Sequence, residues 1–255
     1  MYEEVCYRKS FLKQVIAKVD FASPLKQLDD GVPPNLLNAI VHHFAIVEPP
    51  ADMLSHEVSF DNAGVRTKQI TSKQRSFFAI DRSRQLVLAA QAMFINYTSY
   101  STYEETKAQF VAAIDAISAS FPEAKVARFG LRYINEITVP LDDPTQWETY
   151  IDDRLLGSRS FFGDHDPLTR SVSITELGYD EIGLRFQYGI PNPDYPAVVR
   201  RPLFILDFDA SVSQAHDLRD VAGYMDAAHG RIQELYERSI KESLREQMDV
   251  RRVQQ

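Results

Sequence analysis

The fold is decided by the stretch Arg128-Phe129-Gly130-Leu131-Arg132-Tyr133-Ile134-Asn135-Glu136-Ile137, near the middle of the 255-residue chain. Its apolar residues recur at every second position, which is the period of a β-strand with one buried face. The buried face is expected to carry Phe129, Leu131, Tyr133 and Ile137, and the other face Arg128, Arg132, Glu136 and Thr138. A helical pattern ends just before this stretch, and a turn-rich segment begins just after it. We therefore interpret the stretch as the hinge between two similar halves of the chain.

The residues before this strand predict the element order β-α-β-β-β-(β)-α. The helices are expected at 35–44 and 103–120, where Ser101 and Thr102 offer an N-cap and acidic residues occupy the first turn. The strands are expected at 11–21, 57–60, 65–71, 76–81 and 85–100, the last as one long central strand. The turn Asp61-Asn62-Ala63-Gly64 predicts a hairpin within this series.

The residues after the turn at Pro140 repeat this order. Strands are expected at 126–138, 171–177, 181–190 and 203–208, a short helix around Trp147 to Leu155, and a long helix at 221–248. Aligning Pro24-Leu25 with Pro140-Leu141 places Val15 over Leu131 and preserves which residues point inward. We therefore expect two halves, 1–122 and 123–255, packed as one compact unit.

Two such halves predict an α+β fold in which antiparallel sheets carry long helices on one face. This arrangement resembles the pseudo-twofold saddle of the TATA-box-binding-protein-like architecture. A likeness of architecture alone implies no function. The two longest loops are expected at 156–170 and 191–202, and long loops often carry binding sites.

Composition narrows the function classes. The apolar content of 44% and the charged content of 25% are those of a globular protein. The net charge of −8 opposes nonspecific binding to nucleic acid or to anionic membranes. We find no apolar run long enough to span a membrane, and the start Met-Tyr-Glu-Glu lacks the pattern of a signal peptide. We therefore expect a cytoplasmic protein with no membrane partner.

The single cysteine, Cys6, excludes an intramolecular disulfide. It can be a nucleophile or a small apolar residue near the chain terminus. We favour the apolar role because no base is evident near it in the sequence.

Three motifs carry a family resemblance that covers most of the chain. They are an early Leu-x-x-Val-Ile strand with Leu12, Val15 and Ile16, the central signature Arg128–Ile137, and a late acidic strand Leu206-Asp207-Phe208-Asp209 followed by a helix with His229 and Tyr236-Glu237-Arg238-Ser239-Ile240. The chain resembles a sporadically distributed family of uncharacterised bacterial and archaeal proteins. The resemblance implies no activity, so it supplies no catalytic residues.

The sequence contains no strong motif for binding a metal ion or a phosphate group. We find no Gly-rich phosphate loop, no Gly-x-Ser-x-Gly elbow and no His-Glu-x-x-His helix, and we expect no cofactor. The weak metal candidates are His42-His43, His56-Glu57 and Asp164-His165-Asp166. Adjacent helical histidines point about 100° apart, which disfavours a shared ion. We expect His42 to be exposed and His43 to be partly buried, and we interpret Asp164, His165 and Asp166 as a solvated turn.

The ligand-binding candidates are Arg128, Arg132, Asn135 and His229. The two arginines share a strand face and can bind phosphate or carboxylate, or can pair with acids on neighbouring strands such as Asp207 or Glu176. Asn135 shares the parity of the buried residues and is expected to fix local backbone. His229 lies near the apolar side of the last helix and is interpreted as a hydrogen-bonded core histidine rather than a general base.

Our leading hypothesis is a non-enzymatic binding or assembly protein that acts through a groove or sheet surface around the central strand. Self-association as a homodimer is one form of it. The alternatives are a nucleic-acid-binding saddle, which the net charge disfavours, and an enzyme that acts on an anionic small molecule through Arg128, Arg132 and His229. The sequence does not identify the ligand or the partner.

Overall fold

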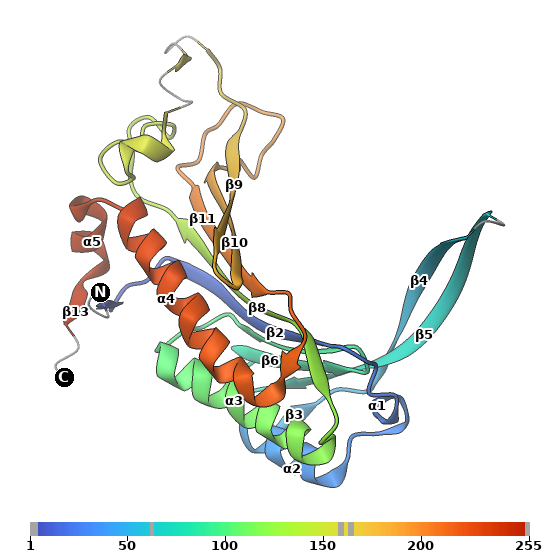
Figure 1. Cartoon of the computed structure of the whole chain (residues 1–255). Coiled ribbons are helices and arrows are strands. Elements are labelled where there is room, and N and C mark those ends of the chain that lie inside the picture. Colours follow the sequence, from blue (N-terminus) through green and yellow to red (C-terminus); the bar gives the residue numbers. More distant parts are fainter. Residues whose placement is uncertain (1–4, 62–63, 158–160, 163–165, 253–255) are drawn as a thin grey trace. The chain divides into compact units, whose positions relative to one another are not determined.

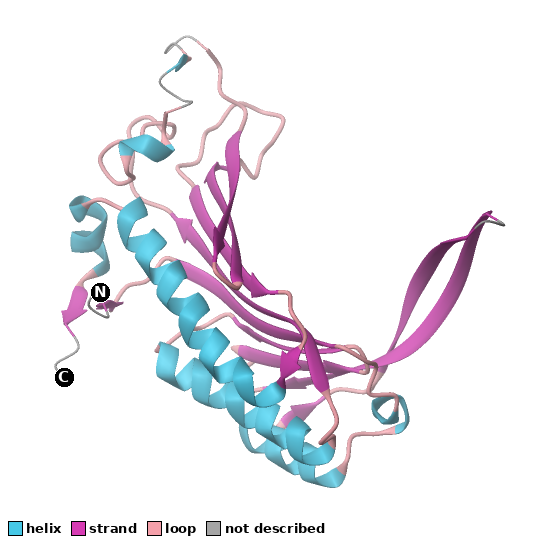
Figure 2. Cartoon of the chain, viewed as in Figure 1, coloured by secondary structure: helices cyan, strands magenta, loops and turns pink. Residues whose placement is uncertain are grey.

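The computed structural model describes residues 5–61, 64–157, 161–162 and 166–252. It is a mixed α/β protein with a large, open antiparallel sheet and five α-helices in that part of the chain (Figures 1 and 2). The predicted combination of an antiparallel sheet with helices is therefore confirmed, whereas the internal repeat and the saddle remain predictions. Of the helices described, none has both the length and the apolar character needed to cross a membrane.

The chain forms two compact units that are interleaved in sequence. Unit 1 contains residues 1–15, 131–212 and 225–255, and unit 2 contains residues 16–130 and 213–224. Strands β2 (Leu12–Phe21) and β8 (Lys125–Ile137) contribute residues to both. The sequence analysis expected two continuous halves, 1–122 and 123–255, within one compact unit. The bounds of units 1 and 2 differ from these halves.

Unit 2 contains most of the N-terminal elements. Its strands are hydrogen-bonded in the order β3-β5-β6-β7-β2-β8, with β4 paired to β5 and β12 to β8. The further strands are β3 (Ile46–Val47), β4 (Ala51–Asp61), β5 (Gly64–Phe78), β6 (Arg84–Ala89), β7 (Ala92–Tyr97) and β12 (His216–Asp217). The helices are α1 (Gln27–Asp30), α2 (Pro34–His43), α3 (Tyr103–Ser120) and the 3₁₀ helix η3 (Leu218–Asp220).

Helix α3 forms as predicted and closes the core of unit 2. The backbone N–H of Glu105 donates to the Thr102 hydroxyl over 3.2 Å, which satisfies one free donor at the helix start. The buried face of α3 includes Phe110, whose ring lies 6.2 Å from that of Phe129 on β8. Burial of large aromatic side chains of this kind is the main favourable contribution to folding.

Two strand predictions in unit 2 are wrong. Residues 65–71 and 76–81 were expected as separate strands, but β5 runs unbroken from Gly64 to Phe78. The expected long strand 85–100 is instead the hairpin β6–β7, which turns at Ala90-Gln91. This turn contains no Gly, Pro, Asn or Asp, so the sequence carries no turn signal there. The central residues of the predicted Asp61–Gly64 turn, Asn62 and Ala63, lie outside the described residues.

Unit 1 contains the C-terminal elements. Its main strands follow the order β8-β11-β10-β9, and a separate two-stranded sheet pairs β1 with β13. The bounds are β1 (Val5–Tyr7), β9 (Ser171–Tyr179), β10 (Ile182–Ile190), β11 (Phe204–Val212), β13 (Val250–Arg252), the 3₁₀ helix η1 (Asp153–Leu155), α4 (Val221–Ser239, of which residues 225–239 lie in unit 1) and α5 (Glu242–Met248). Helix α4 packs on this sheet through Tyr236, whose ring lies 6.4 Å from that of Phe208.

Two helix predictions in unit 1 are also wrong. The helix expected at 221–248 is divided into α4 and α5, because Ile240 leaves the helix to form a β-bridge with Ile151. The Lys241 N–H then donates to the Tyr150 carbonyl over 2.8 Å. The short helix expected around Trp147 to Leu155 is a series of turns that ends in η1, although Trp147 itself is fully buried.

A buried carboxylate joins the first strand to the last two helices. Glu237 on α4 is only 7% exposed and accepts hydrogen bonds from the Tyr7 hydroxyl at 2.8 and 2.9 Å. The Arg245 guanidinium on α5 lies 3.0 Å from the same carboxylate. Burial and the hydrogen bond to Glu237 together raise the pKa of Tyr7 well above its usual value. The three groups therefore satisfy one another in a largely desolvated position.

Gly189 on β10 provides a test of the sheet geometry in unit 1. Its φ is +131°, and a Cβ atom at this position would lie 2.1 Å from the Ser171 carbonyl oxygen on β9. We expect Gly189→Ala to lower the free energy of unfolding by about 3 kcal/mol, because the methyl group must displace backbone. Gly178→Ala on β9 is the matched control, since a Cβ there meets no atom within 4 Å. Urea denaturation measures both, and an equal effect of the two substitutions would contradict the expected strand approach.

Candidate functional site

Arg132 forms a bidentate ion pair on the face of the unit 1 sheet that points away from α4. Its Nε donates to Asp207 Oδ1 over 2.8 Å, and its Nη2 donates to Oδ2 over 2.6 Å. The Asp207 side chain is only 5% exposed, whereas that of Arg132 is 38% exposed. The hydrogen bond to Asp207 raises the pKa of Arg132. Both donor groups of the Arg132 guanidinium therefore bind Asp207 within the protein. This is the ion pair that the sequence analysis gave as the alternative to ligand binding.

Asn135 points to the opposite face of β8 from Arg132, and His229 of helix α4 lies against that opposite face. Asn135 is 4% exposed, and its Nδ2 donates to the Leu206 carbonyl over 3.1 Å, which agrees with the expected role in fixing backbone. The Tyr133 hydroxyl lies 3.1 Å from His229 Nδ1, so strand β8 and helix α4 share a polar contact there. The alternation of β8 thus separates Arg132 from the Tyr133–His229 pair.

Arg128 belongs to unit 2 and has its own acidic neighbour. Its Nη1 lies 3.9 Å from Asp20 on β2, and Lys18 Nζ lies 2.7 Å from the same carboxylate group. The four predicted ligand-binding residues therefore do not converge within either unit. Arg132, Asn135 and His229 are in unit 1 on two sheet faces, and Arg128 is in unit 2.

The metal candidates receive little support. His42 and His43 are both exposed at the end of α2, as expected for His42, and His43 is buried only slightly. Residual burial, His42 and Arg84 together lower the pKa of His43. Asp164 and His165 lie outside the described residues, and Asp166 is exposed in a bend. In the described ranges, no three His, Cys, Asp or Glu side chains are grouped so as to hold a metal ion.

The single cysteine, Cys6, lies on strand β1, where it is the register partner of Arg251 on β13.

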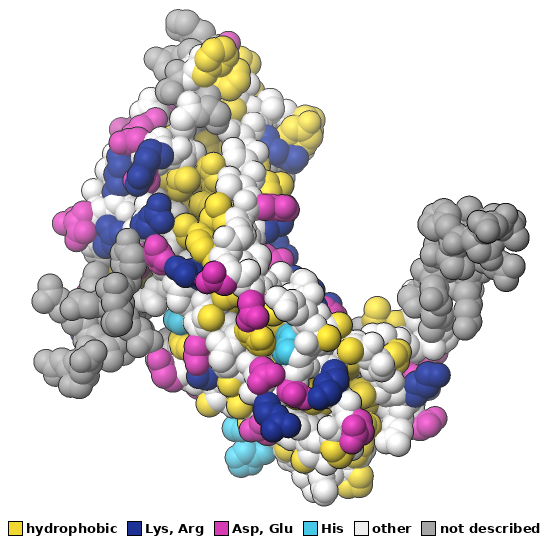
Figure 3. Space-filling model, in the orientation of Figure 1, with side chains coloured by type: hydrophobic (Ala, Val, Ile, Leu, Met, Phe, Trp, Pro, Cys, Tyr) yellow, Lys and Arg dark blue, Asp and Glu magenta, His cyan; other side chains and the backbone are white. Residues whose placement is uncertain are grey.

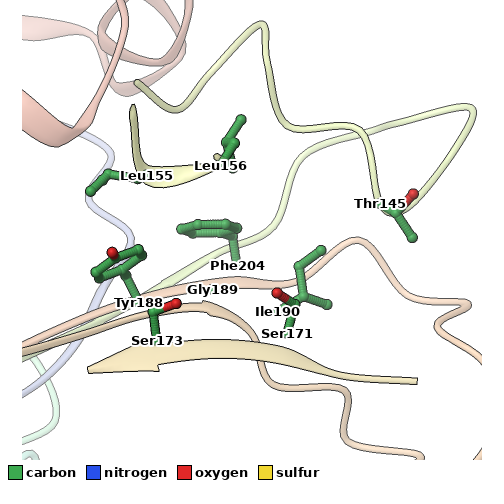
Figure 4. Close-up of a pocket in the computed structure, with 9 residues that line it drawn as sticks. All are labelled: Thr145, Leu155, Leu156, Ser171, Ser173, Tyr188, Gly189, Ile190 and Phe204. Carbon is green, nitrogen blue, oxygen red and sulfur yellow. The ribbon is translucent and has the colours of Figure 1, made fainter. Parts of the chain in front are cut away.

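The cavity drawn in Figure 4 lies in unit 1, beside the close approach of β9 and β10 at Gly189. Its volume is about 20 Å³, which is room for roughly one water molecule. Side chains from Leu155, Leu156, Tyr188 and Phe204 surround it, with the hydroxyls of Ser171 and Ser173 at its border (Figure 4). A cavity of this size holds no metabolite.

The most unusual feature of unit 2 is the ribbon formed by β4 and the distal part of β5, which we call the β4–β5 arm (residues 52–61 and 64–73). Residues 74–78 of β5 pair with β6, but the arm residues pair only with each other in the part of the chain described (Figure 1). Its exposed apolar residues include Met53 and Leu54, which are 45% and 61% exposed.

The base of the arm is held by α1. Arg75 on β5 is 9% exposed and donates to the backbone carbonyls of Leu28 and Asp29. The Lys73 N–H donates to Asp29 Oδ1 over 2.9 Å. The base of the arm is therefore anchored to α1 within unit 2. The polar run Ser72-Lys73-Gln74-Arg75 between the two expected strands has little strand propensity, which explains why the sequence did not predict one continuous strand.

Surface charge shows no dominant strip on the visible face. In Figure 3 the Lys and Arg side chains of that face lie among Asp and Glu rather than in a continuous band. In unit 1, register places Arg185 of β10 opposite Asp209 on β11 and Glu176 on β9. Arginines on this sheet therefore have acidic neighbours across the strands.

Comparison with known proteins adds no identification. The chain matches no protein-family model, and a search of curated proteins finds no significant match. The family resemblance of the central signature therefore stays an expectation. The arguments about function that follow depend on the geometry described above.

The Arg132–Asp207 pair gives a direct test of a structural role. Arg132→Met leaves a buried carboxylate without its partner and is expected to cost about 2 kcal/mol of unfolding free energy, less than a fully buried pair because Arg132 is partly exposed. Arg132→Met combined with Asp207→Leu should recover most of this loss. Chemical denaturation of the double-mutant cycle measures the coupling.

The control for this cycle is Arg238→Met. Arg238 is half-exposed and lies 3.7 Å from Glu234 on the surface of α4. We expect a change within about 0.5 kcal/mol there. If Arg132→Met were equally mild, Asp207 would not depend on the ion pair, and a ligand-binding role for Arg132 would regain support.

Proposed function

We propose that the protein is a non-enzymatic assembly module whose β4–β5 arm docks on a second copy of the chain. The observation that carries the proposal is the arm itself, a ribbon paired only within itself among the described residues. A two-stranded ribbon buries too little surface to be stable on its own in water. Docking on a partner supplies the missing burial.

Self-association is favoured over an unrelated partner because one chain offers uncovered strand edges on both β4 and β9. Strand β4 pairs only with β5, and strand β9 at the end of the unit 1 sheet pairs only with β10, within the described ranges. Such edges present backbone N–H and C=O groups to other strands. Two copies supply both edges in equal number, so β4 of one copy can pair with β9 of another without a third component. Ile174, which is 55% exposed on β9, adds an apolar contact for Met53 or Leu54.

The alternative functions draw less support. A nucleic-acid saddle needs a basic sheet face, but Arg132 is bound to Asp207 and Arg185 lies opposite Asp209 and Glu176. An enzyme that combines Arg132 with His229 needs both on one side of β8, and they lie on opposite faces of that strand.

Shortening the arm tests the proposal. Because Asp52 pairs with Lys73 in the hairpin register, residues 53–72 can be replaced by Asn-Gly, which forms a two-residue hairpin turn. We expect sedimentation velocity to show concentration-dependent dimers or larger species for the full chain and a monomer for the shortened one. The thermal unfolding of the body of the protein should change little, because the anchor residue Arg75 is retained.

Two point variants distinguish an effect at the β9 edge, where the arm is proposed to dock, from a general effect of surface substitution. Ile174→Lys places a charge on the β9 edge and is expected to weaken association about tenfold or more while leaving the fold intact. Phe161→Ser is the matched control, since Phe161 is 85% exposed and belongs to neither edge. A full chain that stays monomeric at high concentration, or a shortened chain that associates as before, would overturn the proposal.

A further inference from the structure

A polar cavity of about 160 Å³ opens in unit 2, beside the first turns of α3. Its volume corresponds to roughly five water molecules, eight times that of the cavity in Figure 4. Three segments supply its lining: the turn between β5 and β6, the end of β7 with the loop that follows it, and the N-terminal part of α3. The residues on which the argument depends are Asp81, Arg84, Tyr97, Ser99, Glu105 and Gln109.

Two buried polar atoms of this lining have no hydrogen-bond partner among the described residues. They are Oε1 of Gln109 and Nε of Arg84. Gln109 is only 7% exposed, and its other amide atom, Nε2, donates to Glu105 Oε1 over 3.1 Å. Arg84 Nη1 lies 3.6 Å from that same carboxylate oxygen. Glu105 thus holds both side chains in position, while one acceptor and one donor remain unused beside the cavity. Buried polar atoms are rarely left in this state.

The missing group must both accept and donate a hydrogen bond. An acceptor is needed for the Arg84 N–H and a donor for the Gln109 oxygen, and a hydroxyl group supplies both. Two neighbouring hydroxyls on one molecule can do the same. A carboxylate supplies acceptors only and leaves Gln109 Oε1 without a donor. Inorganic phosphate keeps an O–H donor at neutral pH, but it brings negative charge to the site.

The charges of the lining also oppose an anion. Asp81 and Glu105 outnumber the single cation, Arg84. Hydrogen bonds from the Ser83 hydroxyl and backbone lower the pKa of Asp81, so this carboxylate stays ionised and accepts hydrogen bonds at neutral pH. The Tyr97 hydroxyl donates to the Thr106 carbonyl over 3.2 Å and so has its proton already committed. The cavity is therefore rich in acceptors, which matches a neutral ligand that carries several O–H donors.

We propose that this cavity binds a small neutral polyhydroxy compound, a monosaccharide or a polyol of similar size. A ligand hydroxyl, or two adjacent ones, engages Arg84 Nε and Gln109 Oε1 once these side chains turn toward the cavity, since both atoms have less than 1 Å² of accessible surface in the structure. Further hydroxyls donate to the Asp81 carboxylate. The site is independent of the β4–β5 arm, so the two proposals stand or fall separately.

Ligand-observed NMR by saturation transfer, followed by isothermal titration calorimetry, tests the site on the full chain. The probes are glycerol, ribose and glucose, with inorganic phosphate as the anionic comparison. We expect saturable binding of at least one polyhydroxy probe and none of phosphate. Gln109→Leu should weaken that binding about tenfold, the loss typical of one desolvated hydrogen bond. Gln91→Leu is the matched control, because Gln91 is exposed and lies outside the cavity.

A second variant covers the case in which Gln109→Leu disturbs the fold. Ser99→Phe changes an exposed loop residue on the border of the cavity and should abolish binding by filling it, with Gln109 and Arg84 unchanged. The proposal is overturned if no polyhydroxy probe binds saturably, which would mean a pocket that holds solvent only. It is equally overturned if phosphate binds in their place, or if a folded Ser99→Phe variant binds as the unaltered chain does.

Discussion

The alternation of buried and uncovered side chains along β8 is the constraint on which the rest of the structure depends. From Phe129 to Ile137 every second residue is buried, and the strand contributes to both compact units. A shift of one residue in its register would exchange the two faces, moving Arg132 into the core and Leu131 out of it. The cost of burying an unpaired guanidinium forbids that shift. Hydrophobic burial on one face and the Arg132–Asp207 pair on the other therefore specify the same register.

This alternation also explains why the most distinctive polar residues form no single site. Neighbouring positions on a strand point in opposite directions, so residues close in sequence, such as Arg132 and Tyr133, serve different environments. Arg132 meets an acid from β11, whereas Tyr133 meets His229 on α4. Atoms with unmet hydrogen-bonding capacity occur instead at Gln109 and Arg84, where no sequence motif marks them. The two side chains come from a helix and a strand separated by 25 positions, and only the folding of unit 2 brings them to one cavity.

The fold was predictable where side-chain period and capping chemistry agree, and not elsewhere. Helix α3, with Thr102 as its cap, and strands β2 and β8 follow directly from such patterns. The β6–β7 turn at Ala90-Gln91 has no turn-forming residue, and the break after Ser239 depends on a bridge to Ile151, a partner remote in sequence. The Arg132–Asp207 contact was foreseen as one of two possible pairings because charge complementarity is readable from sequence. The polar cavity was not, since an unpaired amide oxygen is a property of three-dimensional packing.

The Glu237 carboxylate has a consequence for how the chain can be shortened. Its hydrogen-bond donors come from Tyr7, near the start of the chain, and Arg245, near its end. Removal of the first ten residues would take away the Tyr7 hydroxyl and uncover one side of an acid that is otherwise shielded from water. The β1–β13 pairing would be lost in the same step. The N-terminal and C-terminal segments therefore stabilise each other within unit 1, and a deletion in either segment weakens the packing of the other.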